Sequence, residues 1–263
     1  MKVHAELAAV GRLTDCQKIE MFSVFAKYYE AVEFDIFLSD LREKNDVILL
    51  LAGKKIVGFS TLLCREMIVQ GKKVLGVYSG DTILEKEYWG SSALGKKFLK
   101  YLWLKKLARP GTPVYWFLIS KGYKTYLLMA NNFANHYPRM ESETPSFEKE
   151  LMNTFYGERF AKKYIPEKGV IAMPEDSCRL KEAVAPITEE LKREVPRVAF
   201  FESNNPKWAS GHELACIAEM SALMPFKYSL KKMMKTKKAP SARGVGRQPL
   251  HAVKRIPGEQ RVS

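Results

Sequence analysis

The stretch "EYWGSSALGKKFL", residues 87–99, lies where an apolar, strand-like run gives way to a helix-like one. Small residues are concentrated at the junction and a lysine follows at once: Gly90, Ser91, Ser92, Ala93, Gly95, Lys96. The first amides of a helix have no partner inside it, and together with the helix dipole they attract anions. The segment therefore predicts either a phosphate-binding turn or a plain N-capped helix, in which serine is equally favoured.

The segments around this turn predict a strand-rich core. "DVILLLAGKKIVGFSTLLC" (46–64) and "MIVQGKKVLGVYSG" (67–80) each contain a Gly-Lys turn, which predicts three successive strands ending near residue 84. A helix is expected over 92–107, where "RPGTP" then breaks it. The apolar run "VYWFLIS" (114–120) is typical of a strand buried on both faces, and another helix is expected over 122–131.

Two helices are predicted before this core and mixed elements after it. Thr14 and Gln17 have the spacing of a capping box, and a second helix follows with an apolar stripe at Phe34, Phe37, Leu38 and Leu41. Beyond residue 140 we expect a helix from Thr144 and Pro145, since proline is favoured at a helix start. Short strands are expected near 169–173, 197–201 and 213–218.

The order over residues 10–140 is helix, helix, three strands, helix, strand, helix, and it resembles the GNAT acyltransferase superfamily. "EKEYWGSSALGKKFL" (85–99) has the rhythm of that family's acyl-CoA turn, although Trp89 replaces an Arg, Ser92 replaces a Gly and Gly95 comes one place late. The resemblance implies an α/β (α+β) fold with a mixed central sheet and flanking helices, plus an irregular C-terminal extension and a basic tail. It divides the chain into a core (1–140), an extension packed on that core (141–222) and a basic amphipathic segment with its tail (223–263).

In this family a central strand splays from its neighbour, and the following turn binds the pyrophosphate of acyl-CoA. The resemblance thus implies a thioester co-substrate, acyl-CoA or an acyl-carrier-protein thioester, and no metal. Backbone groups near Ile83 and Leu84 would bind the pantetheine arm and polarise the thioester carbonyl. The co-substrate contacts expected by resemblance are Ile83, Leu84, Trp89, Gly90, Ser91, Ser92, Ala93, Gly95 and Lys96.

Gly80 and Asp81 interrupt an otherwise apolar strand, and polar residues there need a reason. In the family a carboxylate on this strand deprotonates the acceptor amine, so Asp81 is the expected base, with Tyr78 as a neighbour. The alternative is a carboxylate bonded to backbone at a bulge marked by Gly80. Many enzymes of the family use a tyrosine to protonate the leaving thiolate. The resemblance places it near residues 128–129, where this sequence has no tyrosine, so His136 is kept as a further catalytic candidate.

The charge is unevenly distributed along the chain. Of the net +14, residues 225–263 carry +10, so the rest of the protein is nearly balanced and does not indicate a nucleic-acid-binding body. Within 223–238, apolar residues share one helical face and lysines the others, which predicts either an anionic-membrane contact or a core helix with a solvated face. Nucleic acid is disfavoured because base-stacking aromatics are absent after Tyr228.

The resemblance implies an N-acyltransferase that moves an acyl group from a thioester to an amine acceptor, and the apolar extension and basic tail favour a long chain or a lipid-like amine. Two alternatives stay open: a non-catalytic GNAT-like protein that binds membrane or nucleic acid, and a small-molecule acetyltransferase. No apolar stretch approaches the roughly 20 residues of a membrane span, so the expected location is cytoplasmic, with peripheral attachment at the inner membrane face as the variant.

Overall fold

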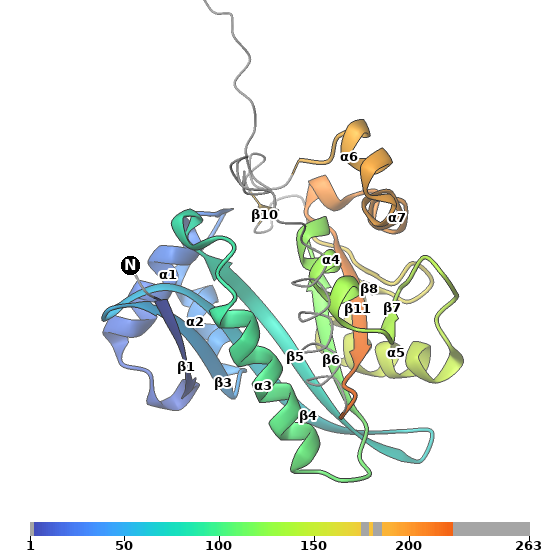
Figure 1. Cartoon of the computed structure of the whole chain (residues 1–263), viewed down its shortest axis with the longest axis horizontal. Coiled ribbons are helices and arrows are strands. Elements are labelled where there is room, and N and C mark those ends of the chain that lie inside the picture. Colours follow the sequence, from blue (N-terminus) through green and yellow to red (C-terminus); the bar gives the residue numbers. More distant parts are fainter. Residues whose placement is uncertain (1–2, 175–178, 181–185, 223–263) are drawn as a thin grey trace, which may run out of the picture. The chain divides into compact units, whose positions relative to one another are not determined.

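The protein is built on one mixed β-sheet, shown for a computed structural model in Figure 1. The structure describes residues 3–174, 179–180 and 186–222. The strands follow the order β1-β3-β4-β5-β6-β11-β9-β8, and β7 also pairs with β11. Their bounds are β1 (Val3–Ala9), β3 (Asp46–Ala52), β4 (Lys55–Val69), β5 (Lys72–Leu84), β6 (Val114–Ser120), β7 (His136–Tyr137), β8 (Tyr164–Ile165), β9 (Val170–Ile171) and β11 (Glu213–Glu219).

The three-strand meander predicted around residues 46–84 is confirmed as β3, β4 and β5, each antiparallel to the next. Glycines at the two hairpin turns adopt positive φ, +65° at Gly53 and +73° at Gly71, a conformation that other residues rarely accept. β5 then pairs with β6 in parallel, and β6 with β11 antiparallel. A separate two-stranded ladder joins β2 (Tyr29–Glu30) to β10 (Arg179–Leu180).

Helices cover both faces of the sheet, as the resemblance implied. On one face lie α3, α4 and α7; on the other lie α1 and α2 together with α5. The predicted capping box at the start of α1 is present, with the Thr14 side chain accepting from the Gln17 amide. The helix bounds are α1 (Asp15–Ala26), α2 (Phe34–Arg42), α3 (Ala93–Leu107), α4 (Tyr123–Asn132), α5 (Ser146–Phe160), α6 (Glu189–Glu194) and α7 (Pro196–Asn204).

The C-terminal extension is more regular than its sequence indicates. The strand expected near 213–218 is confirmed as β11 (Glu213–Glu219), which pairs with β6 from Tyr115 to Ser120 inside the sheet. The strand expected over 197–201 is wrong, because Pro196 opens α7 and the residues three apart, Val198 and Phe201, are buried on one helical face. β1 was not predicted, although it pairs with β3 over its whole length.

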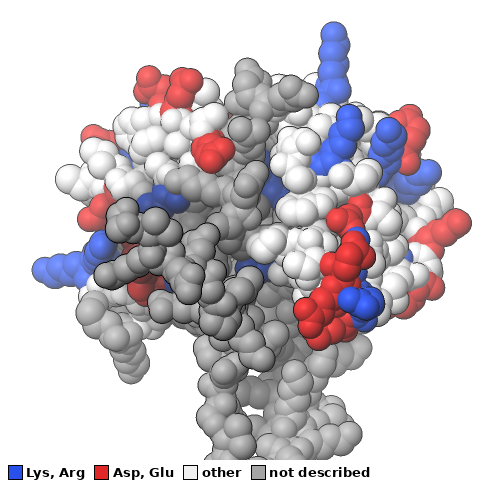
Figure 2. All heavy atoms as spheres, turned by 90° about the horizontal axis from the view of Figure 1, so that it is seen from above, with Lys and Arg blue, Asp and Glu red and all other residues white. Residues whose placement is uncertain are grey.

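No helix among the described residues has the length and apolar content required to cross a bilayer. In Figure 2 acidic and basic side chains are interspersed over the described part of the face shown, in agreement with the nearly balanced charge of residues 1–224. The basic amphipathic segment and tail lie outside the described residues.

Candidate active site

The parallel pairing of β5 with β6 stops before either strand ends. The last paired residues are Ser79 and Leu118, whereas β5 continues to Leu84 and keeps its partner β4 to that point. From Gly80 to Leu84, β5 is therefore paired with β4 on one side and has no strand partner among the described residues on the side of β6. This is the splay that the GNAT resemblance implies, and it leaves backbone groups of β5 facing a gap.

The two residues predicted to face this gap are not equivalent. The Glu85 amide donates to the Val57 carbonyl at 2.9 Å, and antiparallel alternation then directs the backbone groups of Ile83 toward β4. Those of Thr82 and Leu84 point to the gap instead. The Leu84 carbonyl accepts a hydrogen bond from Trp89 Nε1 at 2.9 Å, so of the two backbone groups of Leu84 the amide stays directed at the gap.

The small-residue turn continues directly from this strand into α3. Gly90 has φ +88°, and it carries no neighbouring atom within 4 Å of a would-be Cβ. Ser91 Oγ accepts from the Ala93 amide at 3.3 Å, whereas Ser92, the N-cap residue, makes no side-chain cap bond. Gly95 also faces open space. The first turn of α3 therefore has narrow side chains, an unused serine hydroxyl at Ser92 and the exposed Lys96 beside it.

Trp89, in the position of the family's arginine, spans from the turn toward α4. Its indole donates to Leu84, its ring lies 5.1 Å from Lys124 Nζ, and the Tyr28 ring is 6.3 Å away. Trp89 thus packs where the resemblance places a phosphate-binding arginine, and it supplies an aromatic surface instead of a positive charge.

Asp81 lies at an irregularity of the β4–β5 ladder, where Thr61 faces both Gly80 and Asp81. This is the β-bulge suggested by Gly80, and it turns the carboxyl toward the face covered by α2 and α5. Burial raises the pKa of Asp81 to about 7, helped by the nearby Asp40 carboxylate and opposed by the Lys44 ammonium. A carboxyl poised near neutrality while still partly accessible suits a general base.

Tyr78 lies on the same face as Asp81 but is buried under Arg159, whose guanidinium carbon is 4.9 Å from its ring centre. Burial holds the pKa of Tyr78 well above its usual range, so its hydroxyl stays protonated.

His136 is not brought to this site. It faces Ala218 of β11, which is level with Trp116 of β6 and Val77 of β5, so three strand spacings, about 14 Å, separate it from β5. Its Nδ1 is 2.8 Å from the Phe133 carbonyl, and burial lowers its pKa. At the expected tyrosine position of α4, Leu128 is exposed and Met129 is buried.

Three charged residues near Asp81 were missed by the sequence analysis: Asp40, Lys44 and Arg159. They come from α2, the turn after it and α5: Asp40 and Lys44 pair locally, four residues apart, and Arg159 joins them because the extension returns α5 to this face of the sheet. The four-residue spacing of Asp40 and Lys44 was an available local signal for their ion pair, whereas nothing near them in the sequence indicates Arg159.

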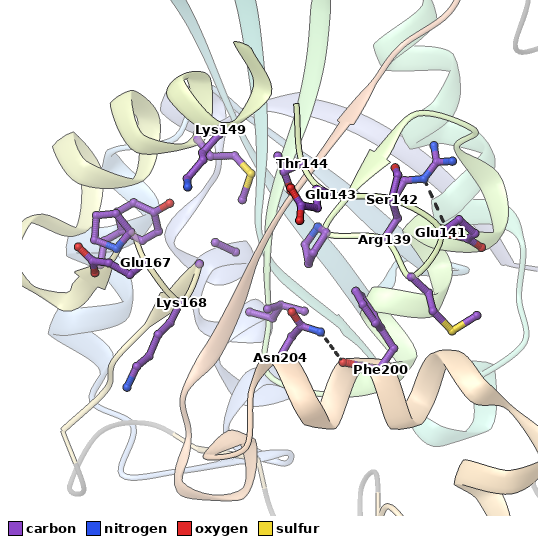
Figure 3. A pocket seen from close by; sticks show the side chains of 18 residues that line it. Arg139, Glu141, Ser142, Glu143, Thr144, Lys149, Glu167, Lys168, Phe200 and Asn204 are labelled. Atoms are coloured by element: carbon purple, nitrogen blue, oxygen red, sulfur yellow. Dashed lines mark hydrogen bonds and ion pairs between the residues drawn. The ribbon is translucent and has the colours of Figure 1, made fainter. Parts of the chain in front are cut away.

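A separate cavity of about 700 Å³ opens at the outer edge of β11 (Figure 3). The cavity lies between the segment that follows β7 (138–144) and the turn between β8 and β9 (166–169). Residues of both charges line it, among them Arg139, Glu141, Lys149 and Lys168. Asp81 does not line it. Within the described ranges, no group of three or more metal-ligating side chains is assembled.

No family model and no curated protein matches the chain. Among solved structures, it is similar to a protein of unknown function from Enterococcus faecalis described as a probable N-acyltransferase (15% identity, TM-score 0.38, 49% of this chain and 32% of that one). It is also similar to a GCN5-related N-acetyltransferase from Kribbella flavida (15%, 0.37, 51% and 34%) and to an aminoglycoside acetyltransferase from a soil metagenome in complex with sisomicin (17%, 0.37, 55% and 93%).

The matched part spans about a third of the length of the first two of these structures. The two N-terminal helices, the antiparallel meander, the parallel β5–β6 pair that parts after Ser79 and the helix that follows the turn are all present. This order and this gap are those that the resemblance to the GNAT superfamily implies.

Proposed function

We propose that the protein is an N-acyltransferase that transfers an acyl group from a thioester to an amine. The observation that carries the proposal is the position of Asp81: a partly accessible carboxyl with a pKa of about 7, at a bulge beside the one-sided end of β5. A base and an unpaired backbone donor thereby lie on the same short segment, which is the arrangement that aminolysis of a thioester requires.

The proposed reaction follows from these two groups. The amine nitrogen attacks the thioester carbonyl carbon and a C–N bond forms, while Asp81 takes the proton that the nitrogen loses. The Leu84 amide, directed at the gap, stabilises the negative charge that develops on the carbonyl oxygen. The C–S bond then breaks, and the thiolate leaves and takes a proton from water, since no tyrosine of α4 occupies the expected acid position.

The turn after β5 supports a thioester donor that carries phosphate. The narrow first turn of α3, the Ser92 hydroxyl and the Lys96 ammonium suit a pyrophosphate or a phosphopantetheine phosphate. We therefore propose acyl-CoA or an acyl-carrier-protein thioester as donor. A long acyl chain or lipid-like amine, and an anionic membrane contact through residues 223–238, are extensions of this proposal.

The test is a panel of acyl-CoA donors and amine acceptors with product detection by mass spectrometry. Asp81→Asn should slow transfer by about a hundredfold or more, while the donor still raises the melting temperature. Asp15→Asn, which changes an exposed aspartate at the start of α1, is the matched control and should leave the rate unchanged. Equal rates for Asp81→Asn and wild type across the pH range would contradict Asp81 as the base.

One observation favours the second candidate, a non-catalytic binding protein. Trp89 stands in the position of the family's arginine and supplies no positive charge, so the turn is less suited to phosphate than its glycines alone suggest. In that case acyl-CoA neither shifts the melting temperature nor yields product with any amine of the panel. A shift without product would indicate a binding protein that retains the donor site.

A further inference from the structure

A lysine is buried beside the proposed base. Lys44 follows α2 at the entrance to β3, and its side chain is 0% exposed. Lysines are almost never fully buried unless they are paired. Lys44 Nζ donates to Asp40 Oδ2 at 2.6 Å and to the Asp40 carbonyl at 3.0 Å, and desolvation lowers its pKa. The ammonium is thus held in one place by two bonds to a single residue.

The lysine side chain lies against the bulge that presents Asp81. A Cβ added to Gly80 would stand 3.0 Å from Lys44 Cε and 2.6 Å from Thr61 Oγ1. Gly80 therefore leaves the space that Lys44 fills, and the next residue along the strand is the proposed base. The two features that the sequence shows side by side, a glycine and an aspartate in an apolar strand, have one explanation in this contact.

A second cation fixes the other side of Asp40. Arg159 of α5 donates from one nitrogen to Asp40 Oδ1 at 3.1 Å and from the other to Glu43 Oε2 at 3.0 Å. Its guanidinium also lies over the Tyr78 ring. Each carboxylate oxygen of Asp40 thus has its own cation, and the extension, through α5, holds the loop that carries Lys44.

The remaining charges around Asp81 are paired as well. Glu213 of β11 binds Lys121 at 2.9 Å, and Tyr78 of β5 is neutral. The charged groups that act on Asp81 are Asp40, Lys44, Glu213 and Lys121, and Arg159 lies beside Asp40. Among the described residues, Asp81 is the carboxylate of this cluster that forms no ion pair within 4.0 Å.

We propose that Lys44 is a positioning residue for Asp81: its buried ammonium, fixed by Asp40 and through Asp40 by Arg159, lies against the bulge and favours the ionised, proton-accepting form of Asp81. This inference rests on the proposed function for its consequence in catalysis, but not for its physical content. A buried positive charge stabilises a neighbouring carboxylate whether or not a substrate is present. It also makes α5 of the extension part of the catalytic arrangement.

The test measures the charge of Asp81 directly. The carboxyl ¹³C resonance of Asp81, assigned with Asp81→Asn, is titrated in the full-length protein and in Lys44→Met. Methionine is similar in length to the aliphatic part of the lysine side chain. Asp40 still forms its ion pair with Arg159 in this variant, so its carboxylate is not left unpaired. We expect the midpoint for Asp81 to rise by about one pH unit or more. Lys106→Met is the matched control, since Lys106 Nζ also bonds a backbone carbonyl (Thr112, 2.8 Å) but belongs to α3; it should leave the midpoint unchanged.

A second variant keeps the inference testable if Lys44→Met does not fold. In Lys44→Gln the positive charge is removed while a side-chain donor to Asp40 is kept, so the midpoint for Asp81 should rise as in Lys44→Met. An unchanged midpoint in either folded variant overturns the role of Lys44. Because the titration needs no substrate, a shifted midpoint with no acyl transfer refutes the proposed function alone. If transfer is measured, the pH profile of kcat/KM in Lys44→Met should move to higher pH with the ¹³C midpoint, and a fixed profile contradicts the positioning role.

Discussion

Adding one methyl group at Gly80 should strain the centre of the proposed site. In Gly80→Ala the new Cβ would meet Thr61 Oγ1 at 2.6 Å, Lys44 Cε at 3.0 Å and Tyr78 Cε1 at 3.5 Å. The closest contact is with a threonine that is 1% exposed, and a β-branched side chain has little freedom to turn away. The methyl group is therefore accommodated only by a shift of β4, β5 or the Lys44 stem.

Overpacking of this kind costs about 1–3 kcal/mol in the free energy of unfolding. For a folded unit of this size each kcal/mol lowers the melting temperature by about 2–4 °C, so we expect a fall of roughly 2–12 °C. Gly95→Ala is the matched control, because nothing lies within 4 Å of its Cβ and alanine is better than glycine in a helix by about 1 kcal/mol. It should raise the melting temperature.

Differential scanning calorimetry of the two variants decides the sign, and a double-mutant cycle identifies the partner. Thr61→Ala removes the closest atom, so Gly80→Ala should cost much less in that background than alone. A melting temperature for Gly80→Ala that is equal to wild type, or a cost that is the same with and without Thr61, would refute the close approach at the bulge.

Three further predictions concern the same protein. Because the pKa of Asp81 is raised to about 7, its ionisation opposes folding, so the gain in melting temperature of Asp81→Asn over wild type should grow from about pH 4 to pH 7 and stay level above; a constant difference would contradict the raised pKa. Ser92→Asp should abolish the rise in melting temperature caused by acyl-CoA, because a carboxylate would meet the phosphates, whereas Ser146→Asp at the start of α5 should not; an equal rise in both removes the turn from the donor site. Removal of residues 236–263 should weaken co-sedimentation with anionic vesicles only in part and Lys227→Glu with Lys231→Glu and Lys232→Glu further, at low salt; intact protein that stays in the supernatant would contradict the membrane contact.

The elements that the sequence predicted well are those with local causes. The capping box of Thr14, the hairpin turns at Gly53 and Gly71 and the apolar run of β6 each fix their conformation within a few residues. β1 was missed because its residues alternate only weakly and are held by pairing with β3, some 40 residues further along the chain. Residues 197–201 were assigned to a strand because a short apolar run does not by itself distinguish strand from helix.

The candidate site divides in the same way. Gly80 and Asp81 were visible as an interruption of an apolar strand, and that local signal led to the bulge. The cluster of charged residues around them was not visible in the sequence, since Arg159 and Asp40 are separated by 119 positions in the chain. The hydrogen bond from Trp89 Nε1 to the Leu84 carbonyl could not be predicted either, because it depends on the side-chain conformation of Trp89 and not on which residue types are present.

The place of β11 inside the sheet has a consequence for synthesis. β6 is an almost fully buried apolar strand, and β11, which covers one of its edges from Tyr115 to Ser120, is encoded about a hundred residues later. Until residues 213–219 leave the ribosome, the nascent chain carries a hydrophobic strand with unpaired amides and carbonyls along one side. Such an edge is a template for intermolecular strand pairing. Premature termination before β11 would thus yield aggregates in place of a smaller folded domain, and chaperone dependence would be confined to that interval of translation.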